Sequence, residues 1–350
     1  MASTYRTCCL MAFLTCVLIS SVAFSTLTVH AMGRKVVPLA ACSNQSDSTP
    51  THIAPGRVGK IKEYTVPDGG VWGITAGPDG NLWFTMTDAQ SIGRITPQGV
   101  ETIYHLADQN SFPGGITTGA DGNLWYTESV NKIGRITPQG QVTEFTLPDS
   151  NSYSMAITRG PDGNVWFTEP GKIGYITPQG KITEFPLPNT DFRDGITTGA
   201  DGKLWFTSSN ENTIGRISLQ GKVTEYPVPT AGSNLVGITT GPDGNLWFTE
   251  YSGNKIGRIT TKGHITEFPT GTSEPPLFIE AGPDGKLWFT ESVTCGGSGD
   301  SIARISLKGV VKVFPIPYSY PVGITSGPQS AMWFAGFGDF SGLIGKVATK

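Results

Sequence analysis

Histidine is scarce in this sequence: only four of the 350 residues are histidine, His30, His52, His105 and His264. The sequence also contains no serine nucleophile elbow and no Cys/His spacing typical of a zinc site. Histidine is the side chain most often used for general acid–base catalysis. None of the four is expected at the candidate ligand site described below, so such chemistry there would fall to carboxylates or tyrosine.

A basic excess is also missing, since the formal net charge is −3 and charged residues make up 15% of the chain. Nucleic-acid-binding proteins usually carry a basic excess, so nucleic acid is not expected as the main partner. Cysteine is nearly absent outside the N-terminal region, which contains Cys8, Cys9 and Cys16. The other two, Cys42 and Cys295, could form one disulfide or remain as two free thiols, but they do not make a disulfide scaffold.

Long apolar runs occur only at the N-terminus, where Arg6 is the single charge before a run from about Cys8 to Val29. The segment Val29-His30-Ala31 ends this run with small residues placed as at a cleavage site, which is typical of a secretory signal. Residues 1–31 are therefore predicted to be a signal peptide, and the protein to be secreted and extracellular. An uncleaved membrane anchor stays open, because about 20 apolar residues can span a bilayer.

A third interpretation of the N-terminal region is lipidation of Cys42. The segment Leu39-Ala40-Ala41-Cys42 looks like a bacterial lipoprotein box, although Arg34 and Lys35 separate it from the apolar run. Residues 43–57 are rich in Ser, Thr and Pro, a composition typical of flexible linkers. We therefore predict a flexible polar spacer over residues 32–57.

Helix is not expected after about residue 40, because the chain contains 46 glycines and 25 prolines. A tryptophan recurs there at intervals of 42, 41, 39, 42, 41 and 45 residues. Seven units of about forty residues are typical of a propeller or a solenoid. The seven tryptophans are Trp83, Trp125, Trp166, Trp205, Trp247, Trp288 and Trp333.

Each unit contains four strand-like pieces, which the fifth unit spells as VGITTG, NLWFTE, KIGRIT and HITEFP. Asp243-Gly244 joins the first two, and Asp-Gly between apolar runs is a strong hairpin signal. Three successive apolar residues in LWF indicate a strand covered on both faces. The fourth piece alternates and contains proline, which is tolerated on an edge strand.

The ends of the repeat region predict a closed ring. Residues 60–67, KIKEYTVP, form a fourth strand with no unit before it, and the last unit stops without a fourth strand. A solenoid would need capping units instead. We therefore predict an all-β, seven-bladed β-propeller over residues 58–350, with four antiparallel strands per blade and strand 60–67 completing the last blade.

Two of the four connections in each unit vary in length, and both emerge on the same side of the ring, here called the loop face. Variable loops on a rigid scaffold are the usual place for function. The residues that begin the first strands should surround the mouth of the ring there; they are Trp72, Gly114, Met155, Asp194, Val236, Leu277 and Val322. The candidates for the ligand-binding face are Trp72, Met155, Asp194 and Tyr320.

Carboxylates end the second strand in four of the units. Glu128, Glu169, Glu250 and Glu291 could hold a cation such as Mg²⁺ or Ca²⁺. The favoured alternative is a framework salt bridge to an arginine of the next strand, such as Glu128 with Arg135. The Gly-rich loop at residues 293–301 lacks a P-loop lysine, so it does not predict a phosphate site.

The repeats GPDGNLWFTE, NKIGRIT and ITEFPLP resemble those of the virginiamycin B lyase family, over roughly residues 58–350. The resemblance implies enzymes that open the ester-linked ring of type B streptogramins by elimination, with Mg²⁺. It also implies one histidine in the sixth unit and one in the seventh, assisted by glutamates near the seventh. The matching positions here are Leu277, Val322, Tyr320 and Phe337.

The lyase scaffold is therefore predicted without the catalytic set, and no catalytic residue is assigned. The favoured function is a monomeric binding propeller whose loop face holds a small ligand, a glycan or a protein. The alternative is a metal-dependent lyase that acts on a cyclic depsipeptide or a related ester through the rim carboxylates. No cofactor is expected, and Mg²⁺ enters only through the resemblance.

Overall fold

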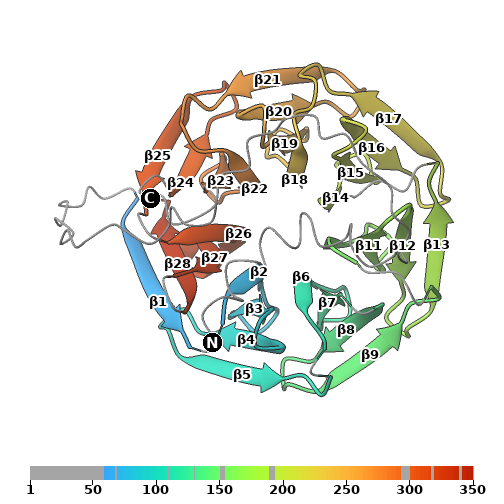
Figure 1. Cartoon of the computed structure of the whole chain (residues 1–350), viewed down its shortest axis with the longest axis vertical. Coiled ribbons are helices and arrows are strands. Elements are labelled where there is room, and N and C mark those ends of the chain that lie inside the picture. The colour runs from blue at the N-terminus through green and yellow to red at the C-terminus, as the bar shows by residue number, and fades with distance from the viewer. Residues whose placement is uncertain are drawn as a thin grey trace, which may run out of the picture. The chain divides into compact units, whose positions relative to one another are not determined.

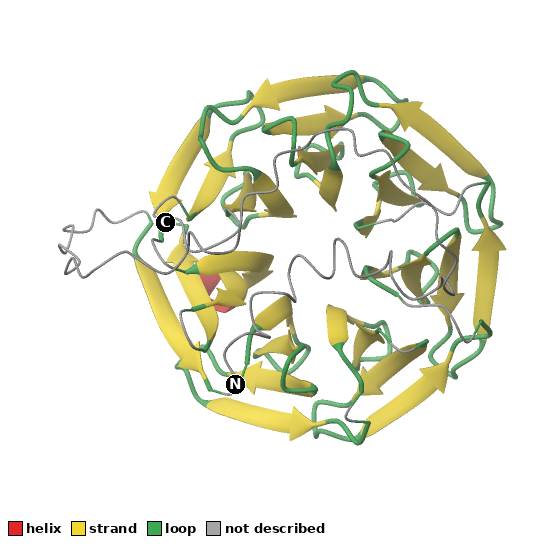
Figure 2. Cartoon of the chain, in the orientation of Figure 1, coloured by secondary structure: helices red, strands yellow, loops and turns green. Residues whose placement is uncertain are grey.

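The computed structural model describes residues 59–67, 69–108, 110–129, 131–149, 154–188, 194–292, 300–316, 319–338 and 341–349. Within these ranges, seven four-stranded antiparallel sheets surround a central axis (Figure 1). Figure 2 shows strands almost throughout, with one short 3-10 turn, η3 (Pro328–Ser330). The predicted seven-bladed β-propeller is confirmed.

The predictions for residues 1–31 and 32–57, and those for Cys42 and Cys295, lie outside the described residues. Signal peptide, membrane anchor, lipidation and disulfide therefore stay predictions. Within the described ranges, no helix has the length and apolar character needed to cross a membrane.

Each blade contributes one strand to the inner layer and one to the outer layer of the ring. The inner strands are β2 (Val71–Ala76), β6 (Pro113–Thr118), β10 (Ile157–Arg159), β14 (Ile196–Thr198), β18 (Leu235–Thr240), β22 (Pro276–Ala281) and β26 (Tyr320–Gly327). The outer strands are β5 (Glu101–His105), β9 (Val142–Thr146), β13 (Ile182–Pro186), β17 (Val223–Pro227), β21 (Ile265–Pro269), β25 (Val311–Pro315) and β1 (Ile61–Val66). Blades are numbered 1 to 7 in this order.

The two middle strands of each blade form its buried centre. The second strands are β3 (Leu82–Met86), β7 (Leu124–Glu128), β11 (Val165–Glu169), β15 (Leu204–Ser208), β19 (Leu246–Glu250), β23 (Leu287–Glu291) and β27 (Ala331–Phe337). The third strands are β4 (Ser91–Ile95), β8 (Lys132–Ile136), β12 (Lys172–Ile176), β16 (Thr213–Ile217), β20 (Lys255–Ile259), β24 (Ser301–Ile305) and β28 (Gly342–Ala348). The second strands of blades 1 to 6 are buried at all five positions, as the LWF pattern predicted.

The ring closes where strand β1 pairs antiparallel with β28, as predicted from residues 60–67. The Gly59 N–H donates to the Ala348 carbonyl at 3.1 Å, and the Ala348 N–H donates to the Lys60 carbonyl at 3.2 Å. These bonds correspond to the turn that joins the third and outer strands in the other blades, where the Gly99 N–H, for example, donates to the Thr96 carbonyl at 2.9 Å. Strand β1 therefore supplies the outer strand that the last repeat lacks.

A stacked aromatic pair in each blade links it to the next blade. In blade 1, the Trp83 and Tyr104 rings stack with centroids 5.5 Å apart. Gly140, in a turn of blade 2, lies against the Tyr104 ring, and a Cβ at this glycine would come within 2.2 Å of it. Gly140 also has a φ of +90°, a conformation that favours glycine. The turn glycine is therefore required twice, by the backbone and by the contact between blades.

The Asp-Gly turns have a second role that the sequence did not predict. Asp79 accepts a bond from the Asn81 N–H, as expected of a turn aspartate, and its Oδ1 also accepts from Trp83 Nε1 at 3.1 Å. The same Trp–Asp bond occurs in blades 2 to 6. In blade 7 the aspartate is replaced by Gln329, and Trp333 Nε1 donates instead to the Pro328 carbonyl at 3.4 Å. Each turn aspartate therefore also fixes the orientation of its core tryptophan.

Candidate functional site

Backbone bulges lie at the start of five inner strands. The pairing of β2 with β3 shifts between Val71 and Ile74, so that Trp72 and Gly73 face a single partner residue. The same shift occurs in β6, β18, β22 and β26. Bulges redirect side chains and are frequent beside functional sites. The mouth residue of each of these five strands therefore lies within a bulge, where side chains do not alternate regularly between the two faces of the sheet.

A threonine of the second strand supports the bulges of blades 1, 2, 5 and 6. In blade 1 the Gly73 N–H donates to Thr85 Oγ1 at 2.9 Å, and the Thr85 hydroxyl donates to the Gly114 carbonyl of blade 2 at 2.7 Å. One hydroxyl therefore satisfies a bulge N–H and also bridges to the next blade. The matching donors and carbonyls are Thr127 with Met155, Thr207 with Val236, Thr249 with Leu277, and Thr290 with Val322. Blade 7 has Ala335 at this position.

Blade 6 departs from the repeat at two inner-strand positions. Its strand reads PLFIEA, whereas blade 5 reads LVGITT, so Phe278 and Glu280 stand where a small residue and a threonine occur elsewhere. The Phe278 ring meets the Trp72 ring with centroids 6.4 Å apart and an interplanar angle of 81°. These residues belong to blades 6 and 1, on either side of blade 7. The two half-buried rings therefore join blades that are not sequence neighbours.

Glu280 is an isolated carboxylate on the inner strand of blade 6. Its Oε1 accepts from the Ala281 N–H at 3.1 Å, and its Oε2 accepts from the Thr239 hydroxyl at 3.4 Å. Burial raises the pKa of Glu280 to about 7, and these two bonds only partly oppose the rise. Among the described residues of the seven inner strands, only Arg159 and Glu280 are charged.

A second aromatic pair lies in blade 7. Tyr320 and Phe337 are partners in the β26–β27 ladder, and their rings meet edge to face with centroids 6.2 Å apart. A Cβ at Gly70, two residues before Trp72, would come within 1.8 Å of the Phe337 ring. The start of blade 1 thus packs directly on blade 7. Tyr320 and Phe337 are two of the positions where the resemblance implies glutamates.

The four predicted binding-face residues come from blades 1, 3, 4 and 7. The Met155 carbonyl accepts the Thr127 hydroxyl at 3.3 Å, and Asp194 Oδ2 accepts from Ser209 Oγ at 2.8 Å. Trp72 contacts Phe278, which the sequence analysis did not select. Comparing the repeats column by column would have revealed Phe278 and Glu280, because both replace a residue that recurs in the other blades.

The four predicted metal-ligand glutamates lie at the ends of second strands in four different blades, and each is at most 2% exposed. Glu291 accepts bonds of 2.6 Å from both Thr272 and Ser301, while Glu128 Oε2 accepts from Ser111 at 2.8 Å. Neither oxygen of Glu250 accepts a well-aligned hydrogen bond from a described residue, although Ser233 and Thr230 lie close enough to oppose part of the rise in its pKa. Burial raises the pKa of Glu128 and of Glu250 to about 7.

The predicted salt bridge from Glu128 to Arg135 is wrong, and the ladder register explains why. Glu128 is opposite Lys132, whereas Arg135 is opposite Trp125 and lies over its ring, with Cζ 5.4 Å from the centroid. Lys132 forms its ion pair with Glu144 of the outer strand, at 2.9 Å. The equivalent salt bridge from Glu250 to Arg258, expected from the same alternation, is absent for the same reason, since Lys255 is opposite Glu250 and Trp247 is opposite Arg258.

No group of three or more His, Cys, Asp or Glu side chains is placed to hold a metal ion within the described residues. Glu128 instead accepts a hydrogen bond from the Ser111 hydroxyl, and Glu291 accepts one from the Thr272 hydroxyl. The four glutamates therefore do not converge on one Mg²⁺ site, and no chemical step is assigned to a metal here.

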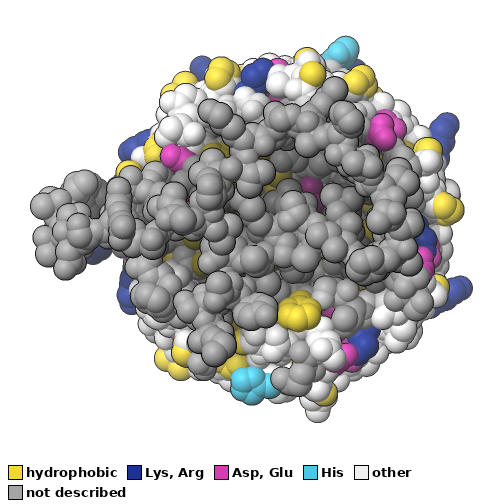
Figure 3. Space-filling view, in the orientation of Figure 1, with side chains coloured by type: hydrophobic (Ala, Val, Ile, Leu, Met, Phe, Trp, Pro, Cys, Tyr) yellow, Lys and Arg dark blue, Asp and Glu magenta, His cyan; other side chains and the backbone are white. Residues whose placement is uncertain are grey.

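The two histidines among the described residues lie on or beside outer strands. His105 ends β5, His264 directly precedes β21, and both are exposed. The histidine side chains visible in Figure 3 accordingly lie at the circumference of the ring. Neither lies on an inner strand, where the mouth residues are.

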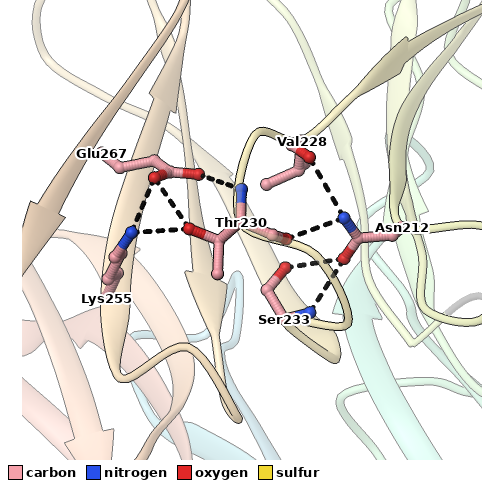
Figure 4. A network of polar contacts seen from close by, with 6 residues as sticks. All are labelled: Asn212, Val228, Thr230, Ser233, Lys255 and Glu267. Carbon is pink, nitrogen blue, oxygen red and sulfur yellow. Dashed lines mark hydrogen bonds and ion pairs between the residues drawn. The ribbon is translucent and has the colours of Figure 1, made fainter.

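The connection between blades 4 and 5 is held by a polar network on the loop face (Figure 4). Glu267 accepts from the N–H and the hydroxyl of Thr230, both at 2.9 Å, and forms an ion pair with Lys255 at 2.8 Å. Asn212 Oδ1 accepts from the N–H and the hydroxyl of Ser233, at 2.9 and 2.8 Å. Side chains of two blades therefore fix this loop from both ends.

One crevice of about 290 Å³ is lined by Ile61, Glu63, Pro315 and Ile316, where outer strands β25 and β1 meet. Glu63 Oε1 accepts from the Ser319 hydroxyl there, at 3.1 Å. The crevice lies at the circumference, away from the inner strands. It does not include any predicted site residue.

The sequence profile of the virginiamycin B lyase family matches residues 51–195 and 171–350. The chain belongs to the virginiamycin B lyase family. The match extends over all of the described residues, so the resemblance inferred from the repeats is confirmed.

Solved structures from this family share the fold along most of the chain. One is a catalytically inactive virginiamycin B lyase from Staphylococcus aureus, with a histidine replaced by alanine, in complex with quinupristin. It is 41% identical, with a TM-score of 0.76, and the match covers 83% of this chain and 99% of that one. A streptogramin B lyase is 37% identical, with a TM-score of 0.76 over 83% of this chain and 98% of that one.

A shorter sequence match occurs with the virginiamycin B lyase of Saccharopolyspora erythraea, which is 48% identical over 56 residues. These residues are 15% of this chain and 19% of that protein, so the match spans about a fifth of this relative's length.

Proposed function

We propose that this family member binds a small ligand at the mouth of its loop face without catalysing the elimination reaction. The observation that carries the proposal is the nature of the side chains at the positions that the resemblance assigns to histidine. Leu277 and Val322 have no proton to give or take, and Val322 is only 2% exposed. A single histidine-to-alanine change accompanies loss of catalysis in the S. aureus relative.

The aromatic side chains near the mouth support a binding role. Trp72 with Phe278, and Tyr320 with Phe337, place four half-buried rings on the strands of blades 6, 7 and 1. Aromatic rings offer large contact areas with little loss of side-chain entropy, and ligand sites are mostly apolar with a few polar groups. The Thr290 bonds to Phe278 and Val322 and the Thr85 bond to Gly73 would hold these strands in place before the ligand arrives. As the N-terminal sequence predicts, the protein would act outside the cell.

The test uses purified protein lacking residues 1–31 and quinupristin as the probe. Binding is measured by calorimetry, and ring opening by chromatography after incubation with Mg²⁺, with a chelated sample in parallel. We expect no linear product at an enzyme concentration at which the S. aureus lyase completes the reaction. Metal-dependent ring opening by this protein would overturn the proposal and favour a lyase that uses carboxylates.

A further inference from the structure

We propose that blades 6 and 1 together bind an organic cation, whose ammonium group lies against the Trp72 and Phe278 rings and pairs with the Glu280 carboxylate. The inference rests on the proposed function, because it names the chemistry of the ligand at the same mouth. Strands β22, β26 and β2 follow one another around the axis in Figure 1. The three residues therefore lie on the inner side of adjoining blades.

Phe278 closes the bulge of β22, and Glu280 follows it by two residues. Ile279 between them is buried in the core, whereas Phe278 and Glu280 are both half-buried, so these two side chains lie on the side of the strand opposite Ile279. Blade 6 is alone in this substitution, since the other inner strands pair a small residue with threonine. These pairs are Gly73 and Thr75, Gly115 and Thr117, Ala156 and Thr158, Gly195 and Thr197, Gly237 and Thr239, and Gly323 and Thr325. Blade 6 therefore has an aromatic ring and a carboxylate at two positions where the other six blades have a glycine or alanine and a threonine.

The fold does not use the charge of Glu280. No ion pair between described residues includes it, and its two hydrogen bonds come from the Ala281 N–H and the Thr239 hydroxyl. A half-buried carboxylate loses much of its hydration, which costs free energy when no cationic partner replaces the water. The threonine of the other six blades avoids this cost. A bound cation would supply the missing partner.

The aromatic pair indicates which kind of cation fits. Trp72 and Phe278 meet edge to face at an interplanar angle of 81°, so the faces of the two rings point in nearly perpendicular directions. An ammonium ion is attracted to the face of an aromatic ring, and alkylated ammonium groups are recognised in this way. Mg²⁺ and Ca²⁺ need several oxygen ligands, which the two rings do not provide. The combination therefore favours an organic ammonium over a metal ion.

All three side chains remain partly exposed, as a ligand-binding role requires. The only other charge on the described inner strands is Arg159, in blade 3, whose strand is not adjacent to those of blades 6, 7 and 1. Among the described residues, therefore, no lysine or arginine forms an ion pair with Glu280.

The test is titration of the protein with choline and with its neutral isostere 3,3-dimethylbutan-1-ol, followed by NMR. We expect choline to bind at least about tenfold more tightly than the isostere, the size expected of a cation–π contact together with a charge pair. Glu280→Thr, which restores the residue of the other blades, should lose about tenfold in choline affinity. The exposed Asp88→Asn is the matched control for net charge and should bind as the parent does.

Equal binding of choline and the isostere, no binding of choline, or unchanged choline affinity in Glu280→Thr would each overturn this inference. If Glu280→Thr fails to fold, the isostere comparison on the unmodified protein still decides. Trp72→Leu provides a second variant, with an expected loss of choline affinity. These results are separate from the quinupristin assay, in which ring opening would overturn the proposed function whatever the choline result.

Discussion

The Thr249 hydroxyl of blade 5 donates a hydrogen bond of 2.6 Å to the Leu277 carbonyl of blade 6. The same hydroxyl accepts the Gly237 N–H at 2.8 Å. A side chain at the end of a buried strand thereby fixes two backbones that line the mouth, one in its own blade and one in the next. Rigidity of the candidate site thus depends on groups that would not contact a ligand.

Replacing Thr249 with Val should destabilise the protein by roughly 1–3 kcal/mol, because the change keeps the shape and leaves a buried donor and a buried acceptor unsatisfied. Urea denaturation measures the free energy of unfolding of the variant and of the unmodified protein. The exposed Thr266→Val on the outer strand is the matched control and should have little effect. Equal stabilities of the two variants would contradict the bridging role.

Gly140→Ala should destabilise the propeller more than Gly122→Ala does. Both glycines have positive φ, +90° and +74°, so both substitutions add backbone strain of about 1–2 kcal/mol. Only the Cβ at position 140 would clash, at 2.2 Å from Tyr104, whereas nothing lies within 4 Å of a Cβ at position 122. The difference in melting temperature measures the contact between blades. Identical melting temperatures would mean that the ring of Tyr104 moves aside freely.

Stability should fall as pH rises from about 4.5 to 7. The pKa of Glu250 is raised from its usual 4.5 to about 7, first by burial and then by the nearby Glu267 carboxylate. Between these values the folded chain holds more protons than the unfolded chain, so the free energy of unfolding decreases with pH. Glu250→Gln should remove part of this decrease and stabilise the protein at pH 7.5 by roughly 1–3 kcal/mol.

Denaturant unfolding at a series of pH values tests the Glu250 prediction. Asp88→Asn, at an exposed position, is the control and should keep the slope of the unmodified protein. The slope does not vanish in Glu250→Gln, because the pKa values of Glu128 and Glu280 are raised to about 7 as well. An unchanged slope in Glu250→Gln would show that its carboxyl titrates normally.

A chain that begins at Gly69 should melt at a lower temperature and aggregate more than one that begins at Gly59. The shorter chain lacks strand β1 and leaves the edge of β28 unpaired. Exposed strand edges promote association between molecules. Thermal unfolding and gel filtration of the two chains provide the comparison. Equal melting temperatures would refute the contribution of β1 to closure.

The fold could be predicted because its information is local and repeated. The Asp-Gly turns, the buried LWF triplets and the strand at residues 60–67 each specify one step of the same architecture. Contacts that depend on register were harder. The expected bond from Glu128 to Arg135 failed because these residues are three ladder positions apart, and Lys132 is the true neighbour.

The site was predicted only in part, since side-chain contacts between blades depend on the geometry of the ring. Trp72 was selected from its place at the start of an inner strand, but its contact with Phe278 spans blade 7 and has no local signal. Glu280 lies on β22 with Phe278, three residues beyond Leu277, the only position of this strand that was considered as a mouth residue. The role of Thr85 and its equivalents follows from the bulges, which the repeat sequence does not mark.

The hydrogen bonds of Ala348 with Gly59 and with Lys60 place the two ends of the propeller at a single hairpin turn. Topologically, the molecule is a circle that has been cut once, at one of seven equivalent positions. A direct peptide link between these ends would cyclise the chain, and a new opening at another such turn, for instance after Gly99, would give a circular permutant with the same blades. The fold therefore does not dictate which of the seven turns contains the ends of the propeller.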